Sequence, residues 1–387
     1  MKEKISIQTL SPVHVGSGDE LLPGIEYLSF HQEGKVAVVE PTKILDIIGE
    51  ENIQHWVSLI EKPNADLLKD LLKVRKPDIE AKDVSLREIN MLNQIPSREK
   101  IKSQIHLGRP NLPSIPGSSL KGSIRTAVLN YLIKKNPRFA SNERNLGRER
   151  GGRISYKDGN IQAHYLAPKQ GTNFRVDPRK DLLRLLRVGD AYFNTQTELN
   201  KSKVVNEYRN GWDEKKQLSS YFECIPSGSQ TTLDITIPED LKKAILRTRH
   251  LETTPDFPAY DIKTLFKLIN KHTLFLLKKE IDFWEDEDNP MVLEEYLDRL
   301  IEIKKIGEAC QNSECILRVG AGSGWHFMTG GWAIDKDEFG DYILNDRTWD
   351  KLKDSMRKGR YSDDVIFPKT RKLIRKGVPF GFIKLSK

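Results

Sequence analysis

Seven residues about a third of the way along the chain combine the groups of a phosphate-binding site. They run from Gly117 to Ser123 and read Gly-Ser-Ser-Leu-Lys-Gly-Ser. A nucleotide-hydrolysing P-loop needs Gly-Lys-Ser/Thr in that order, so nucleotide hydrolysis is not expected here. A helix that opens in this segment would offer free N–H groups, the hydroxyls of Ser118 and Ser119, and Lys121 and Arg125 one turn apart. The segment predicts a site for one phosphate of RNA, and a plain capped helix is the alternative.

A second glycine-rich segment follows a predicted strand near the C-terminal end. Its glycines, Gly320, Gly322 and Gly324, resemble a dinucleotide fingerprint, but the residues after them cannot form the required helix. Three glycines allow the backbone to approach a ligand or a packed element closely, and Trp325 and His326 could stack on a base. A structural turn and an RNA contact therefore both stay open.

His14 is the best candidate for acid–base chemistry because it lies in a glycine-containing loop after the first predicted strand. We expect it and Gly16 to contact RNA. The other seven histidines lack HxH, HxxxH or HxE spacing, so no metal site is expected. There is also no G-x-S-x-G elbow to indicate a serine hydrolase. No catalytic residue, metal or cofactor is predicted.

The net charge of +8 is unevenly distributed. The segment from Arg98 to Arg187 contains 20 Lys or Arg and 6 Asp or Glu, whereas the rest of the chain contains 43 and 49. This basic segment is interspersed with Gly, Ser, Asn and aromatic residues, as in surfaces that follow an RNA backbone. The further predicted RNA contacts are Arg148, Arg150, Arg153, Lys169 and Arg175, with Lys369 and Arg371 near the C-terminal end.

The sign of the charge reverses between Glu280 and Glu302, where ten carboxylates accompany one basic residue. Such a block is typical of an exposed helix face or of a surface that docks a basic partner.

The composition excludes several classes of protein. With 387 residues, 37% hydrophobic and 30% charged, the chain can bury one large core or two ordinary ones. No apolar run reaches the roughly 20 residues of a membrane span, and the N-terminal residues do not resemble a signal peptide, which predicts a cytoplasmic protein. The three cysteines have no CxxC spacing and are expected to be reduced.

Periodicity predicts alternating strands and helices. Strands are expected at Lys4 to Leu10, Tyr27 to Phe30, Lys35 to Val39, within Tyr221 to Ile237, at Cys315 to Val319 and at Gly381 to Leu385. Helices are expected at Lys43 to Ile48, from about Ser118 to Lys135, at Ile262 to Phe283 and at Met291 to Ala309, with a helical stretch from Asn52 to Gln94.

These elements favour an α+β fold of tandem ferredoxin-like (RRM-like) domains with helical and basic loop insertions. The first domain would span residues 1–240, with insertions at about 50–100 and 138–180. The second, a degenerate RRM-like domain with the glycine-rich loop, would span 241–387.

Four segments together resemble the RAMP superfamily of CRISPR proteins. They are Ser11 to Gly18, Ile115 to Ala127, Leu317 to Trp325 with Thr329 to Trp332, and Pro368 to Leu373. Within the superfamily, the order and length look most like the fifth-subunit family of type III-A (Csm) effector complexes.

This resemblance implies RRM-like folds and a place at the end of the backbone filament, near the 3′ end of the CRISPR RNA. The implied partners are the CRISPR RNA, the target RNA, the backbone and small subunits of the complex, and host nucleases during guide maturation. Related backbone subunits cleave target RNA with an aspartate near the first strand. Neither Asp19 nor Glu26 matches that position, and the family is regarded as non-catalytic.

The leading hypothesis is therefore a non-catalytic, guide-RNA-binding subunit that supports guide maturation and antiviral defence. One alternative is a metal-independent endoribonuclease with His14 as general base and Lys121 stabilising charge. The other is a protein-only scaffold that docks a basic partner through the acidic segment.

Overall fold

The computed structural model describes most of the chain, and all structural statements below concern the described residues. These are 2–61, 65–92, 95, 99–108, 110–136, 139–140, 147–150, 153–156, 159–166, 181–208, 211–214, 218–246, 261–286, 293–324, 326–327, 370–374 and 377–387.

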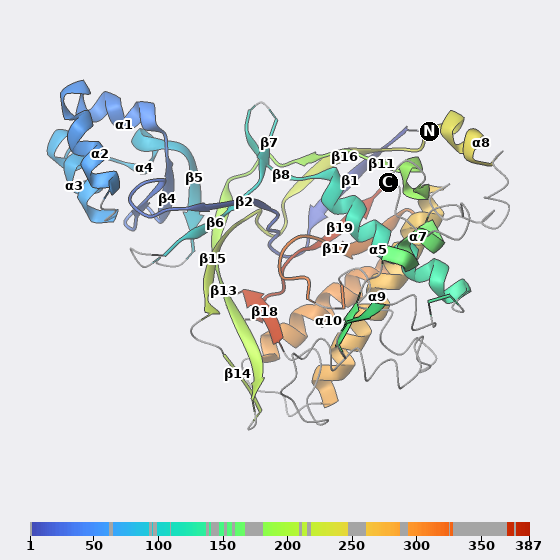
Figure 1. Ribbon diagram of the computed structural model, residues 1–387. Helices are drawn as coiled ribbons and strands as arrows, with labels where there is room; N and C mark the ends of the chain where they lie inside the picture. Colours follow the sequence, from blue (N-terminus) through green and yellow to red (C-terminus); the bar gives the residue numbers. More distant parts are fainter. Residues whose placement is uncertain are drawn as a thin grey trace.

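One antiparallel sheet of five strands joins the two ends of the chain. Its central strand β1 (Lys2–Thr9) lies between β16 (Gln230–Thr236) and β19 (Phe382–Ser386). The outer strands are β11 (Arg187–Val188) and β17 (Glu314–Arg318). The termini consequently lie side by side (Figure 1).

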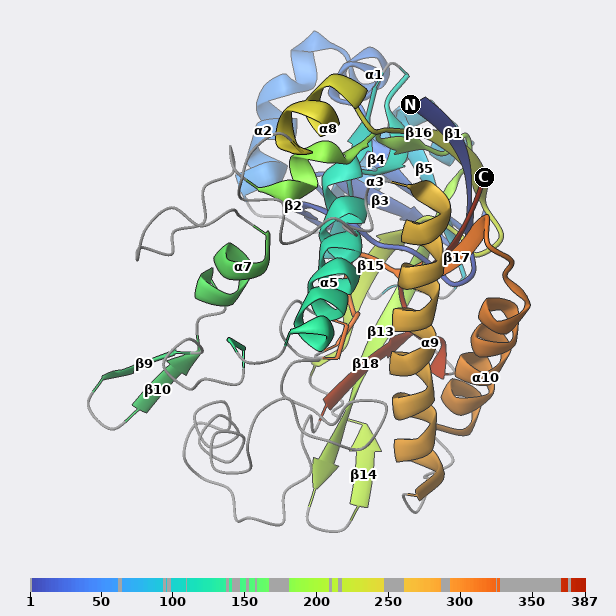
Figure 2. The ribbon, with the colours of Figure 1, turned by 90° about the vertical axis from the view of Figure 1, so that its right-hand side faces the viewer.

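Helices α5 (Gly117–Lys135) and α9 (Ile262–Asp286) pack together against this sheet, and α10 (Glu294–Ala309) lies against α9 (Figure 2). Ile5 and Ile7 are fully buried because alternate residues of β1 point to the helices. The largest core cluster forms between this face of the sheet and the helices.

A second, mixed sheet has nine strands in the order β2-β6-β15-β13-β5-β4-β3, with β14 and β18 also paired with β13. Among the described strands of this sheet, the β13–β5 and β15–β6 pairs are parallel and the other pairs are antiparallel. Its strands are β2 (Gly16–Leu21), β3 (Tyr27–Phe30), β4 (Lys35–Val39), β5 (Ser85–Met91), β6 (Ile101–Gln104), β13 (Thr197–Tyr208), β14 (Gly211–Glu214), β15 (Ser220–Cys224) and β18 (Thr370–Ile374).

A helical lobe covers the β3–β4 end of this sheet, to one side of the remaining elements (Figure 1). It contains α1 (Pro41–Ile48), the 3-10 turn η1 (Glu50–Asn52), α2 (Ile53–Glu61), α3 (Ala65–Arg75) and α4 (Ala81–Val84). It has its own core, in which Ile44, Leu68 and Leu72 are buried.

The remaining elements are short. They are β7 (His106–Leu107), β8 (Leu112–Ile115), β12 (Ala191–Tyr192), the hairpin of β9 (Gly147–Arg150) and β10 (Arg153–Tyr156), α7 (Gly159–Leu166), η2 (Leu182–Leu185) and α8 (Glu239–Leu246).

The α+β class is confirmed, and the predicted hairpin, the helix from 117 to 135 and the two long helices α9 and α10 occur within a few residues of the expected ends. The expectation that residues 52–94 are helical is wrong at its end, because Ser85–Met91 is a strand between β4 and β13. The backbone of this segment forms hydrogen bonds with both neighbouring strands, and this pairing overrides its weak helical period.

The first sheet takes strands from both sides of the proposed domain boundary at residue 240, since β1 and β16 are continued by β19 and β17. That boundary therefore does not separate two sheets. None of the described helices is both long and apolar enough to cross a membrane.

Candidate nucleic-acid interface

An open groove of about 860 Å³ lies where the loop after β1, strands β2, β6, β15 and β18, and the glycine-rich loop meet. Residues far apart in the chain line it: His14, Gly16, Gly18, Asp19, Glu20, Leu22, Glu26, Lys100, Lys102, Ser103, Phe222, Ala321 and Lys372.

Two lysines in this groove share one aromatic ring. The Nζ atoms of Lys102 and Lys372 lie 5.6 and 4.5 Å from the centroid of the Phe222 ring. Burial and the charge of Lys102 lower the pKa of Lys372. Within the described part of the chain, neither ammonium group forms an ion pair with a carboxylate. A bound phosphate would relieve the repulsion between the two cations.

Acidic residues line the same groove along β2, where Glu20 is the cross-strand partner of Lys102. Lys100 and Glu20 form an exposed ion pair at 3.4 Å, and Glu26 accepts a hydrogen bond from the backbone N–H of Leu22 at 2.8 Å. The groove therefore combines two lysines at Phe222 with carboxylates on and after the neighbouring strand β2.

His14 lies beside Phe222 and is 3% exposed. Its Nδ1 is 2.7 Å from the carbonyl oxygen of Glu223, and its ring meets that of Phe222 edge-on with centroids 4.9 Å apart. Burial lowers the pKa of the imidazole below its ordinary value. No group of three or more potential metal ligands occurs among the described residues.

The glycine-rich loop is built onto the His14 loop. The N–H of Ala321 donates to the carbonyl oxygen of His14 at 2.8 Å. A Cβ on Gly320, where φ is +76°, would lie only 2.2 Å from the same oxygen. A Cβ on Gly322 would lie 2.7 Å from the Phe380 ring, whereas one on Gly324 would meet nothing within 4 Å. Close packing accounts for the first two glycines, and Gly324 alone borders open space.

A buried carboxylate below the groove holds several strands in register. Glu223 on β15 accepts two hydrogen bonds from Arg87 of β5, at 2.9 and 3.0 Å, and one from Thr197 of β13 at 2.9 Å. Its Oε2 also accepts from the N–H of Gln104 at 3.1 Å. Arg87 lowers the pKa of Glu223 despite burial, so the pair stays ionised and fixes the strand that bears Phe222.

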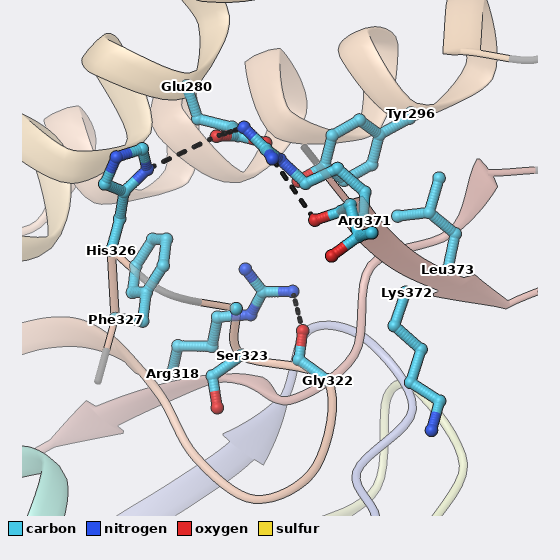
Figure 3. A pocket seen from close by; sticks show the side chains of 12 residues that line it. Glu280, Tyr296, Arg318, Gly322, Ser323, His326, Phe327, Arg371, Lys372 and Leu373 are labelled. Atoms are coloured by element: carbon cyan, nitrogen blue, oxygen red, sulfur yellow. Dashed lines mark hydrogen bonds and ion pairs between the residues drawn. The ribbon is translucent and has the colours of Figure 1, made fainter. Parts of the chain in front are cut away.

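A second buried ion pair lies behind the glycine-rich loop (Figure 3). The Arg371 guanidinium donates to both oxygens of Glu280 on α9, at 2.5 and 3.0 Å. Tyr296 and Trp284 donate to Oε1 of the same carboxylate at 2.9 and 3.0 Å, and His326 Nδ1 lies 3.7 Å from Oε2. This network joins α9, α10, β18 and the loop.

Two predicted RNA contacts thus lie at a buried carboxylate, Arg371 as a buried residue and His326 as a partly buried one. Arg371 is 6% exposed and its charge is balanced by Glu280, while His326 approaches the same carboxylate. The interface described here therefore excludes both. The acidic segment is likewise not a uniform exposed face, because Glu280 at its start is a core residue.

The structure also changes the view of the predicted phosphate site at the start of α5. The N–H of Gly117 donates to the Asp190 carboxylate at 2.8 Å, and Pro116, without a side-chain cap, occupies the N-cap position. Arg125 forms an ion pair with Asp181 at 2.5 Å, and burial lowers the pKa of Lys121. Protein carboxylates occupy two of the groups on which the prediction rested, the Gly117 N–H and the Arg125 guanidinium. This helix start, with Ser118 and Ser119, does not line the groove.

Other predicted contacts cannot be placed in the interface. Arg148, Arg150 and Arg153 lie on the hairpin β9–β10, whose side chains are outside the described part of the chain. Lys169, Arg175, Trp325 and Lys369 lie outside the described residues.

The sequence interpretation missed Lys102, Phe222 and Lys372. The available signal was the period of two in Arg371-Lys372-Leu373: Arg371 and Leu373 point to the core beside α9, and Lys372 points to the groove. Choosing the correct face needed the position of β13 and α9.

Residues 6–325 match the RAMP superfamily. The chain belongs to this superfamily. It is 22% identical over 307 residues to the "CRISPR system Cms protein Csm5" of Methanocaldococcus jannaschii, a match that covers 77% of this chain and 66%, just under two thirds, of that protein.

Two solved structures share the fold. One is a chain of the cryo-EM structure of a Csm–crRNA–target RNA ternary complex of a type III-A CRISPR-Cas system, with a TM-score of 0.73, 20% identity and 100% of both chains covered. The other is the crystal structure of Csm5 from T. onnurineus, with a TM-score of 0.65, 19% identity and coverage of 98% and 99%. The resemblance to the fifth-subunit family is thereby confirmed.

Proposed function

We propose that this chain is a subunit of a type III-A CRISPR effector complex and that its groove binds the backbone of the guide RNA. The observation that supports this most is the Lys102–Phe222–Lys372 arrangement, in which two cations without a carboxylate partner in the described chain flank an aromatic ring. Phosphates bind such cations, and bases stack on such rings, with little dependence on sequence.

The relatives support the subunit role, because one similar chain belongs to a Csm–crRNA–target RNA complex. Within such a complex we propose a position at the end of the backbone, near the 3′ end of the CRISPR RNA, in the cytoplasm. The backbone and small subunits would be its protein partners. Recruitment of host nucleases during guide maturation stays a prediction.

We also propose that the chain is not itself a nuclease. In the alternative, His14 acts as general base and Lys121 stabilises charge. However, Lys121 lies on α5, and no described residue of α5 lines the groove. The groove therefore lacks the pairing that this mechanism needs. If the proposal is correct, purified protein leaves labelled repeat RNA intact in EDTA, and His14→Ala leaves any cleavage by the assembled complex unchanged.

Binding of fluorescent single-stranded RNA to the purified chain, measured from low to moderate salt, tests the proposed function. Affinity should fall steeply with salt and differ little between base compositions, because phosphates supply most of the contacts. A flat salt response, or a strong preference for one base, would refute the proposal.

The finer fold assignment is a further proposal. The elements β1, α5, β11, β16, α9 and β19 follow one another as strand, helix, strand, strand, helix, strand, and the strands lie in the order β11-β16-β1-β19. This is the pattern of a ferredoxin-like unit. It supports one such unit built from both sides of residue 240, and a second unit stays a prediction.

A further inference from the structure

The orientation of His14 determines what its second ring nitrogen, Nε2, can do. Nδ1 lies 2.7 Å from the backbone carbonyl oxygen of Glu223, which can only accept a hydrogen bond. Nδ1 therefore carries the proton. In the neutral ring this leaves Nε2 as an acceptor with a free lone pair.

The surroundings keep the ring neutral. It is buried at the contact with Phe222, and Lys102 and Lys372 both disfavour a positive charge on the ring, while the Glu223 charge acts in the opposite direction. The net effect lowers the pKa of His14, with burial as the main cause. At neutral pH the imidazole thus presents an acceptor, not a donor.

Nε2 is the ring atom next to Gly16, and both residues line the groove. A Cβ on Gly16 would lie 3.1 Å from Nε2, close enough to obstruct this atom from that side. The backbone of Gly16 is not in the left-handed region, so its lack of a side chain is not required by backbone conformation. A glycine here keeps the acceptor accessible.

A strand held by the two lysines offers few hydrogen-bond donors at this depth. Phosphate oxygens only accept, and in RNA the group next to each phosphate that can donate is the ribose 2′-hydroxyl, which DNA lacks. We propose that Nε2 of His14 accepts a hydrogen bond from a 2′-hydroxyl of the bound strand, so that the groove distinguishes RNA from DNA without reading bases. This inference rests on the RNA-binding function proposed above.

The test compares binding of the full-length chain to fluorescent oligouridine, oligodeoxyuridine and 2′-fluoro-oligouridine of one length. Fluorine accepts but does not donate, so it separates the hydroxyl proton from sugar shape. The wild-type protein should bind oligouridine about two- to tenfold more tightly than the other two, as expected for one neutral hydrogen bond.

Two variants then identify the acceptor. His14→Asn retains an amide that can donate to the Glu223 carbonyl but places no acceptor at the Nε2 position, and Gly16→Ala leaves the histidine in place but obstructs it. Both should reduce the RNA preference to about onefold. Gly122→Ala, whose Cβ would meet nothing within 4 Å, is the matched control and should retain it.

The outcomes separate the two proposals. Weak binding of every strand with no salt dependence contradicts the proposed function itself. If binding depends on salt but Gly16→Ala and folded His14→Asn both retain the RNA preference, only the role of His14 is overturned. The same holds if the preference changes with the base when oligoadenosine replaces oligouridine. Since Gly16→Ala retains the histidine, the test does not depend on His14→Asn folding.

Discussion

Replacing Arg371 with methionine should destabilise the protein strongly, although the sequence alone marks this arginine as a surface RNA contact. In the structure its guanidinium donates to both oxygens of Glu280, and the two residues are 6% and 4% exposed. The charge of Arg371 holds the pKa of Glu280 well below its ordinary value, against the opposing effect of burial. Arg371→Met therefore leaves a buried carboxylate without its main cation.

The expected loss of unfolding free energy is about 3–5 kcal/mol, the cost of breaking a buried pair by removing one partner. Tyr296 and Trp284 continue to donate to Glu280, and His326 Nδ1 lies 3.7 Å from its Oε2. These contacts place the loss toward the lower end of the range. Glu280→Gln in the same background removes the charge but retains an acceptor for both donors, so the double variant should be more stable than Arg371→Met alone.

Urea denaturation of the wild type, both single variants and the double variant at pH 7.5 measures these differences as a double-mutant cycle. A loss below about 1 kcal/mol for Arg371→Met would refute the argument that this pair is buried and ionised. Additive losses in the double variant would show that the two side chains do not interact.

Three further predictions follow from the site. Burial lowers the pKa of His14 and His106, so the unfolded chain takes up protons before the folded chain does as the pH drops from 7.5 to 5.5. The free energy of unfolding should therefore fall, by up to about 1.4 kcal/mol per pH unit below 6.5 for each of the two histidines. Urea midpoints that do not move with pH would contradict this prediction. Gly320→Ala should lower the free energy of unfolding by well over about 2 kcal/mol, since its Cβ would lie 2.2 Å from the His14 carbonyl oxygen. Gly324→Ala has a similar φ and no atom within 4 Å of its Cβ, so it should lose only the backbone strain of about 1–2 kcal/mol. Equal melting temperatures of the two variants would disprove the close approach at Gly320. Arg125→Ala should reduce stability by about 1–2 kcal/mol through loss of the Asp181 ion pair, and Lys121→Ala should have a smaller effect, as measured by thermal unfolding.

Local patterns in the sequence were sufficient to predict elements with strong periods. The hairpin β3–β4 and helices α5, α9 and α10 follow from alternation, from helical spacing and from the prolines that limit them. Strand β13, the longest of the second sheet, was missed because its many polar residues are satisfied by β5, β15 and β18, which are distant in the chain. Sequence periodicity contains no information about such partners.

The candidate site shows the same division. The His14 loop and the glycine-rich loop were both candidate contacts from the sequence, and the structure brings them together at the His14 carbonyl oxygen. Charge density, in contrast, pointed to Lys121 and Arg125, and the carboxylates of Asp190 and Asp181 that satisfy that helix start became visible only in three dimensions. Excess charge predicts a polyanion partner but does not identify the lysines that have no carboxylate partner among the described residues.

The most direct test of the central claim is the salt dependence of RNA affinity when Lys102 and Lys372 are both replaced by methionine. Methionine keeps an apolar stem over Phe222 and removes the charge. The slope of log affinity against log salt should become shallower by about 1.4, or 0.7 for each lost contact with a single strand. The control pair Lys134→Met with Lys135→Met, at the far end of α5, should leave the slope within about 0.3 of the wild type. Equal changes from the two pairs would show that bulk charge, and not this groove, binds the RNA.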